Sequence, residues 1–218
     1  MPAVTIENPI LNSPYSEPAR HFRFTDDGIT DEIVEGRRSS SYFVPIPPPK
    51  KKPGGQLALP GDWTAERMQL NDFINRVRDR VTVWRRSGYP GITAITRGLL
   101  DYWADPAREK PLFFCQIEAL ETAIYLTEVA GRHEPWIENH LREENSAKNP
   151  GLSRVAFKMA TGSGKTVVMG MLIAWYTLNE LANPQDKRFS DTFLVVTPGI
   201  TIRDRLQVLR PNMPGNYY

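Results

Sequence analysis

The chain has 218 residues, of which 40% are hydrophobic and 24% are charged, a composition typical of globular proteins and not of disordered ones. Its 27 basic and 25 acidic residues give a net charge of +2, which argues neither for nor against nucleic-acid binding. The single cysteine, Cys115, excludes a disulfide framework and suits a reducing cytosol. No apolar run is long enough to span a bilayer, and the N-terminus lacks the pattern of a signal peptide, so we expect a cytoplasmic protein without a membrane partner.

The first 60 residues are rich in proline, with ten of the 19 prolines of the chain, and this density disfavours helices. Residues 21–25 alternate between apolar and polar side chains, turn-forming residues 26–28 follow, and residues 41–44 form a second extended run. The pattern predicts a hairpin or small sheet with a polar excursion between its strands. Residues 45–55 have the composition of a linker, and their three lysines either form a solvated loop or contact phosphates. We therefore expect residues 1–60 to be a proline-rich extension with short strands.

Residues 61–110 are predicted to form a helical segment. Apolar side chains from Leu70 to Trp84 recur at helical spacing, and the turn at residues 88–91 ends this helix. A second helix is expected over about residues 93–103. Three arginines lie on the other face of the first helix, with two aspartates among them. That face is either simply exposed or a contact to nucleic acid.

Residues 111–218 are predicted to form an α/β domain. Its elements are expected at residues 114–130 (helix), 133–150 (exposed polar stretch), 155–160 (strand), 167–181 (apolar helix) and 192–197 (strand). A strand, a loop, a helix and a second strand form a βαβ unit, which predicts a parallel sheet with a right-handed crossover.

The turn between the first strand and the apolar helix ends in Gly-Lys-Thr, as phosphate-binding loops do. Gly162 and Gly164 have no Cβ to block an approaching phosphate, so the backbone amides around Ser163 can turn inward to bind it. Lys165 can place its ammonium near the β and γ phosphates as the catalytic residue of this loop, and the Thr166 hydroxyl can ligate Mg²⁺.

The strict phosphate-loop pattern has a glycine five residues before Gly164, where this chain has Met159. The alternative is a glycine-rich turn with an incidental lysine, which the surrounding βαβ pattern disfavours. The sequence of residues 160–166 resembles motif I of superfamily 2 helicases and translocases, which tolerates loss of the first glycine. The resemblance implies ATP as the nucleotide and an incomplete RecA-like P-loop NTPase domain at residues 111–218.

The second strand and the residues after it look like motif Ia of the same superfamily. There, the residues that follow the strand contact the backbone of the bound nucleic-acid strand. The resemblance implies this DNA-binding role for Thr197, Pro198 and Gly199. Arg203 and Arg205 either add charge toward phosphates or belong to the start of a solvated helix.

Residues 111–120 resemble the glutamine-bearing helix of the superfamily. The glutamine there reads the adenine edge, and Gln116 is the matching residue. A side-chain amide presents a donor and an acceptor together, which suits N6 and N7 of adenine. The alternative is a glutamine on a helix surface without a role.

Within the superfamily, residues 113–122, 158–166 and 35–46 are similar to restriction (Res) subunits of type III restriction endonucleases. Those proteins use ATP to move or switch along duplex DNA and carry a nuclease domain farther downstream. The resemblance implies a DNA-dependent ATPase that has DNA as a partner, and a modification (methyltransferase) subunit as a second one.

The motif II pattern, an apolar strand followed by Asp-Glu, is missing downstream of the second strand. Asp31 and Glu32 form the only Asp-Glu pair, and they precede the glycine-rich turn and follow no buried strand. We therefore expect the N-terminal part of a longer protein, one that binds nucleotide but hydrolyses little alone. The alternative is a nucleotide-binding module without turnover, completed by a partner chain. A small kinase or GTPase is disfavoured, because we find neither the full phosphate-loop pattern nor a guanine-reading motif.

Overall fold

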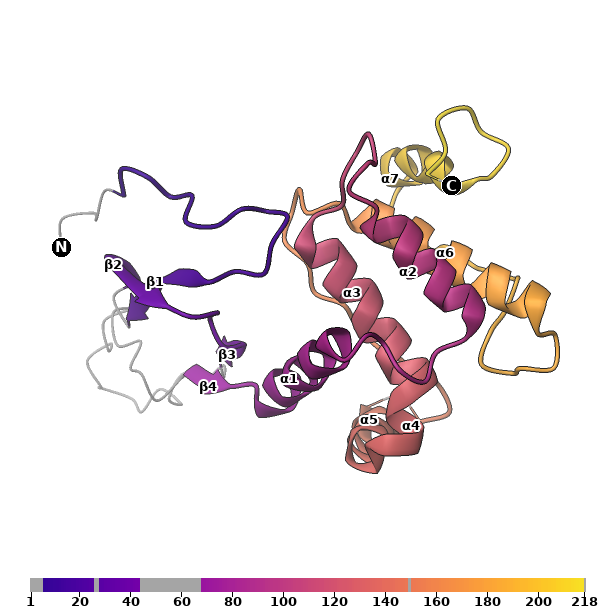
Figure 1. The fold of residues 1–218 in the computed structure, drawn as a ribbon, viewed down its shortest axis with the longest axis horizontal. Coiled ribbons are helices and arrows are strands. Elements are labelled where there is room, and N and C mark those ends of the chain that lie inside the picture. Colours follow the sequence, from indigo (N-terminus) through magenta and orange to yellow (C-terminus); the bar gives the residue numbers. More distant parts are fainter. Residues whose placement is uncertain (1–5, 26–27, 44–67, 149, 218) are drawn as a thin grey trace, which may run out of the picture. The chain divides into compact units, whose positions relative to one another are not determined.

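The computed structural model describes residues 6–25, 28–43, 68–148 and 150–217 (Figure 1). The chain divides into two compact units, Met1–Asp79 and Arg80–Tyr218, and the border falls inside the helix α1 (Asp72–Arg86). The predicted linker at 45–55 and the predicted border at 60/61 lie outside the described residues. The three domains expected from the sequence stay predictions.

The first unit contains two small antiparallel sheets. Strand β1 (Arg20–Thr25) pairs with β2 (Gly28–Glu35), and β3 (Ser41–Phe43) pairs with β4 (Met68–Leu70). The expected strand at 21–25 is confirmed, but its partner is β2 and not residues 41–44. A strand that follows after so short a connection closes a hairpin at low entropic cost. Strand β2 was not predicted because charged residues separate its β-branched residues, so it contains no apolar run.

The start of α1 is tied to this unit by a side-chain amide. The amide oxygen of Asn75 accepts a hydrogen bond from the Ser40 backbone N–H at 2.7 Å, and its amide nitrogen donates to the Ser40 carbonyl at 3.1 Å. The Asn75 amide thus pairs with the backbone as a neighbouring strand would. This pairing fixes α1 against the residue that precedes β3.

The second unit is helical. Its elements in chain order are α2 (Ala94–Ala104), α3 (Phe114–Ile124), a π-helical turn η2 (Tyr125–Val129), α4 (Ala130–His133), α5 (Pro135–Lys148), α6 (Lys165–Ala182), α7 (Ile200–Arg205) and η3 (Leu206–Leu209). Helix α6 packs against α2 and α3, and the three lie beside one another in Figure 1. Leu120, Ile124 and Trp175 are fully buried at this junction.

The predicted helices near 70–84, 93–103, 114–130 and 167–181 are confirmed. The stretch 133–150, expected to be an exposed polar segment, instead contains α5. Pro135 occupies the first helical position, which suits its fixed φ, and Ile137 is buried. Ion pairs at i,i+4 spacing join Glu138 to Arg142 and Glu144 to Lys148. Because of these many charged residues, the segment was not recognised in the sequence as an amphipathic helix.

The predicted parallel sheet is not present in the described part of the chain. Residues 155–160 and 192–197 belong to neither of the two sheets, which are both antiparallel and two-stranded. Leu194 and Val196 are 89% and 82% exposed, although their sequence is that of a buried strand. A segment becomes a strand only by hydrogen bonding to a neighbour, and these two segments flank α6 without pairing to each other.

Candidate nucleotide site at the start of α6

The glycine-rich turn forms a tight bend directly before α6. Gly162 and Gly164 both have left-handed backbone conformations, with φ of +80° and +78°, which residues with a Cβ rarely adopt. The Ser163 hydroxyl donates to the Ala160 carbonyl at 2.7 Å and closes the bend. Lys165 is the first residue of α6, and Thr166 lies in its first turn. The bend therefore precedes a helix N-terminus, as the sequence predicts, but residues 155–160 before it do not form the predicted strand.

The side chain of Lys165 folds back over the bend. Its ammonium donates to the carbonyls of Ala160 at 2.8 Å and of Met159 at 3.1 Å, and the residue is exposed. Both acceptors are neutral. A phosphate oxygen is a stronger acceptor for an ammonium than a carbonyl, because both partners are then charged. The ammonium lies where it can exchange these bonds for a bound anion.

Gln116 lies against the same bend. It is 5% exposed, and its amide nitrogen donates to the Ser163 carbonyl at 3.2 Å. Its amide oxygen accepts from the Phe113 backbone N–H at 2.8 Å, which satisfies one of the free N–H groups at the start of α3. A Cβ built on Gly164 would overlap the Gln116 amide nitrogen, so any other residue here would have to displace the glutamine side chain. The structure thus brings together the predicted residues Gln116, Ser163 and Gly164.

Thr197, Pro198 and Gly199 lie elsewhere in the second unit, at the end of segment 192–197 and before α7. The Thr197 hydroxyl donates to the Gly199 carbonyl at 3.3 Å, and Pro198 and Gly199 are exposed. Arg203, one turn into α7, is 3.4 Å from Asp204 and its side chain is 64% exposed. In the described residues, no hydrogen bond joins this group to the bend at 160–164.

Two buried carboxylates lie between Phe114 and Val129, in α3 and η2, and the sequence analysis missed both. Glu121 is fully buried and accepts hydrogen bonds from Arg85, the shortest at 2.6 Å, and from the Tyr89 hydroxyl at 2.6 Å. Burial, together with this carboxylate, raises the pKa of the Tyr89 hydroxyl above its ordinary value. Burial alone would lower the pKa of Arg85, but hydrogen bonding and charge from Glu121 raise it overall.

The second carboxylate, Glu128, lies in the π-helical turn and links α2 to α6. It is 2% exposed and accepts from the Thr96 hydroxyl at 2.6 Å and from the Trp175 indole N–H at 3.1 Å. Asn179, one turn after Trp175, donates to the Thr96 hydroxyl at 3.1 Å. The sequence did carry a signal for these carboxylates. Glu121 and Glu128 are two helical turns apart, beside the apolar residues that form the buried face of the predicted helix.

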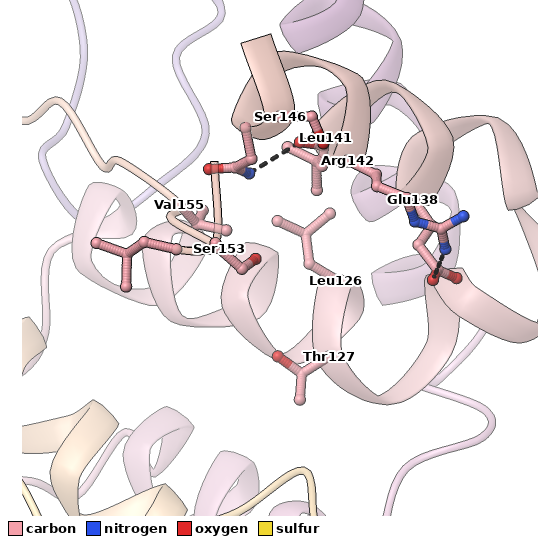
Figure 2. Close-up of a pocket in the computed structure, with 11 residues that line it drawn as sticks. Leu126, Thr127, Glu138, Leu141, Arg142, Ser146, Ser153 and Val155 are labelled. Atoms are coloured by element: carbon pink, nitrogen blue, oxygen red, sulfur yellow. Dashed lines mark hydrogen bonds and ion pairs between the residues drawn. The ribbon is translucent and has the colours of Figure 1, made fainter. Parts of the chain in front are cut away.

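A hollow of about 540 Å³ lies beside the segment that leads into the bend (Figure 2). Leu126, Leu141 and Val155 line it, and the Glu138–Arg142 ion pair lies at one side. In the last turn of α5, the Asn145 amide oxygen accepts from the Arg154 N–H at 2.8 Å, and its nitrogen donates to the Arg154 carbonyl at 3.1 Å. Helix α5 therefore holds Arg154, at the start of the segment that leads into the bend. Gln116 contacts the bend itself, at the end of that segment.

The described residues contain no group of three or more His, Cys, Asp and Glu side chains placed to hold a metal ion. None of the described helices combines the length and the apolar composition that crossing a membrane requires.

Comparison with known families agrees with the resemblance found in the sequence. Residues 109–212 match the family model described as type III restriction enzyme, res subunit. No curated protein and no solved structure gives a significant match. The matched segment contains Gln116, the glycine-rich bend, α6 and residues 197–199. The matched family is one of helicase-like ATPases. Over residues 109–212, just under half of the chain, the sequence is similar to the res subunit of type III restriction enzymes.

Proposed function

We propose that residues 160–166 bind the triphosphate of ATP together with Mg²⁺, and that this chain is the nucleotide-binding part of a DNA-dependent ATPase. One observation carries the proposal. Two glycines with φ near +80° form a bend immediately before the N-terminus of the 18-residue helix α6, within the segment that matches the res-subunit family. Backbone N–H groups at such a bend and at a helix N-terminus favour anions.

The residues of the bend fit the chemistry of a nucleotide triphosphate. No atom lies within 4 Å of a Cβ built on Gly162, so the bend is open on that side. Lys165 would exchange its two carbonyl partners for phosphate oxygens, and the Thr166 hydroxyl would complete the coordination of Mg²⁺. A bound Mg²⁺ neutralises charge on the phosphates. The resemblance assigns Gln116 to the adenine edge, and this role stays a prediction.

We further propose DNA as the macromolecular ligand, bound in part by Thr197, Pro198 and Gly199. Two observations support this role. Pro198 and Gly199 are exposed, and all three residues lie at or directly after the end of segment 192–197. The methyltransferase subunit stays a prediction from the resemblance, and the cytoplasmic location stays a prediction from the single cysteine and the lack of a long apolar run or signal peptide.

A second candidate is a nucleotide-binding module without turnover, completed by a partner chain. It is favoured by the two extended segments 155–160 and 192–197, which have no strand partner among the described residues. Their exposed apolar side chains, such as Leu194 and Val196, are typical of strands that are buried within a larger sheet. Both candidates share the nucleotide site and differ in whether the complete protein hydrolyses ATP or only binds it. We expect no steady hydrolysis, because the sequence has no Asp-Glu pair after the bend.

The test is a calorimetric titration of the 218-residue chain with ATP, with and without Mg²⁺. Lys165→Ala should weaken binding by roughly 10- to 100-fold, the scale of a lost charge-assisted contact. Lys187→Ala removes an equal charge from an exposed site beyond the end of α6 and should change the affinity little. Equal affinities of the wild type and the Lys165 variant would refute the site. Steady phosphate release that depends on Lys165 would refute the expected lack of turnover.

A further inference from the structure

Gln116 makes a contact that its expected role as an adenine reader does not explain. A side-chain amide has two N–H donors and an oxygen with two lone pairs. In this structure, one donor is engaged by the Ser163 carbonyl and the oxygen by the Phe113 N–H, and the residue is 5% exposed. The amide is therefore fixed between the N-terminus of α3 and the glycine-rich bend.

The contact determines the direction of the next backbone N–H. The carbonyl of Ser163 and the N–H of Gly164 belong to one planar trans peptide unit, in which the two groups point in opposite directions. Because Gln116 holds the carbonyl on the α3 side, the Gly164 N–H is aimed away from α3. A rotation of this peptide would turn the N–H toward the glutamine instead.

The fit of Gly164 against Gln116 supports the same conclusion. A Cβ on Gly164 would overlap the Gln116 amide nitrogen and displace that side chain, while a Cβ on Gly162 would meet no atom within 4 Å. The two glycines of the bend are thus required for different reasons. Gly162 needs only its positive φ, whereas Gly164 must also accommodate the side chain that holds its peptide.

We propose that Gln116 is a positioning residue of the phosphate site: it orients the Ser163–Gly164 peptide so that the Gly164 N–H faces the polyphosphate, and it sets affinity for phosphate rather than for the base. This inference rests on the proposed nucleotide site and deepens it. It predicts that Gln116 contributes equally to the binding of ATP, GTP and inorganic tripolyphosphate. A residue that reads adenine would contribute to ATP alone.

Two variants separate the contacts of Gln116. Gln116→Glu keeps the oxygen that accepts from Phe113, and so retains the start of α3, but it removes the donor to Ser163. Gln116→Met is neutral, fills a similar volume and makes neither bond. Gln207→Ala on η3 is the matched control, because it removes the same groups away from the bend. Circular dichroism and thermal unfolding establish that each variant is folded.

The experiment measures Kd of the three ligands with Mg²⁺ for the wild type and each variant. Both Gln116 variants should lose about 5- to 10-fold in affinity, by the same factor for all three ligands, as expected for one lost hydrogen bond. A loss confined to ATP would overturn the proposal and assign Gln116 to the base. No loss for any ligand would overturn it as well.

Hydrogen exchange without ligand tests the positioning role separately from nucleotide binding. Amides of residues 160–166 should exchange faster in both Gln116 variants than in the wild type and the Gln207 control. If the wild type binds none of the three ligands, the nucleotide site fails, and the exchange rates alone still decide whether Gln116 holds the bend. Unchanged exchange in a folded Gln116→Glu chain would overturn the positioning role.

Discussion

Replacing Glu121 by glutamine tests whether a buried ion pair, and not apolar packing alone, holds the end of α1 against α3. Glu121 is fully buried and accepts three hydrogen bonds from Arg85 at 2.6–2.9 Å and one from Tyr89 at 2.6 Å. Glutamine has nearly the same volume, but it loses the negative charge and turns an N–H₂ group toward the donors of Arg85. The guanidinium then remains without its main counter-charge.

The cost can be estimated from the burial of each partner. Removing one member of a fully buried pair costs about 3–5 kcal/mol. The Arg85 side chain is 19% exposed, and Glu118 lies 4.0 Å from it, so water and a second carboxylate recover part of that loss. We therefore expect Glu121→Gln to lower the free energy of unfolding by about 2–3 kcal/mol. This is a large fraction of the stability of an ordinary domain.

Urea denaturation followed by tryptophan fluorescence measures this change, because Trp84 packs edge-on against Tyr89 with ring centroids 4.9 Å apart. Glu118→Gln is the matched control and should cost less than about 1 kcal/mol, since its contact with Arg85 is long. In the double variant Arg85→Met/Glu121→Gln, the cost should be less than the sum of the two single changes. A loss below about 1 kcal/mol for Glu121→Gln would refute the reasoning.

Two further predictions concern the same buried polar groups. Because the pKa of Tyr89 is higher in the folded than in the unfolded chain, folding stability should fall as pH rises above the unfolded value of roughly 10, by up to about 1.4 kcal/mol per pH unit. Tyr89→Phe should remove this component, which urea midpoints at pH 8 to 11 would measure against the wild type; identical slopes would contradict it. Thr96→Val should cost about 2–3 kcal/mol, because it leaves Glu128, Trp175 and Asn179 without the hydroxyl that joins them. Thr96→Ser keeps that hydroxyl and should stay closer to the wild type, and a Val variant as stable as the Ser variant would argue against the network.

The sequence predicted the helices well because their apolar periodicity is determined locally. Val77, Val81 and Trp84 recur on one face of α1, and all three are buried. Helix α5 was missed because eight of its residues, from Glu138 to Asn145, are almost all polar, and only Ile137 is buried in the helix. Tertiary contacts and charge pairs stabilise this helix, and neither can be predicted from a pattern of apolar residues.

The predicted parallel sheet is absent from the described residues for a different reason. The pattern of residues 192–197 predicts an apolar strand, but the chain has no regular secondary structure there. Whether such a segment becomes a strand depends on a neighbour that can be far away in sequence. Periodicity alone carries no information about that neighbour. The same argument applies to the partner of β1, which lay closer along the chain than the apolar run chosen for it.

The position of the bend was predicted from the sequence, but its contacts with other elements were not. Gly162, Gly164 and Lys165 were identified from their spacing, and a bend forms there before α6. The link between Gln116 and Ser163 joins residues 47 positions apart, and no motif in the sequence encodes it. It becomes visible only when α3 and α6 are packed together.

Three buried polar side chains on the helical stretch from Phe114 through η2 hold the neighbouring elements in place. Gln116 holds the bend before α6, Glu121 holds Arg85 and Tyr89, and Glu128 holds Thr96 and Trp175. Apolar contacts alone would allow these elements to slide past one another at little cost, because dispersion and the hydrophobic effect are not directional. Each hydrogen bond instead accepts one geometry, and an unpaired buried polar group is costly. Since Trp175 lies on α6, the contact made by Glu128 fixes the helix whose first residue is Lys165. The position of the bend is thus determined from both ends of one helix.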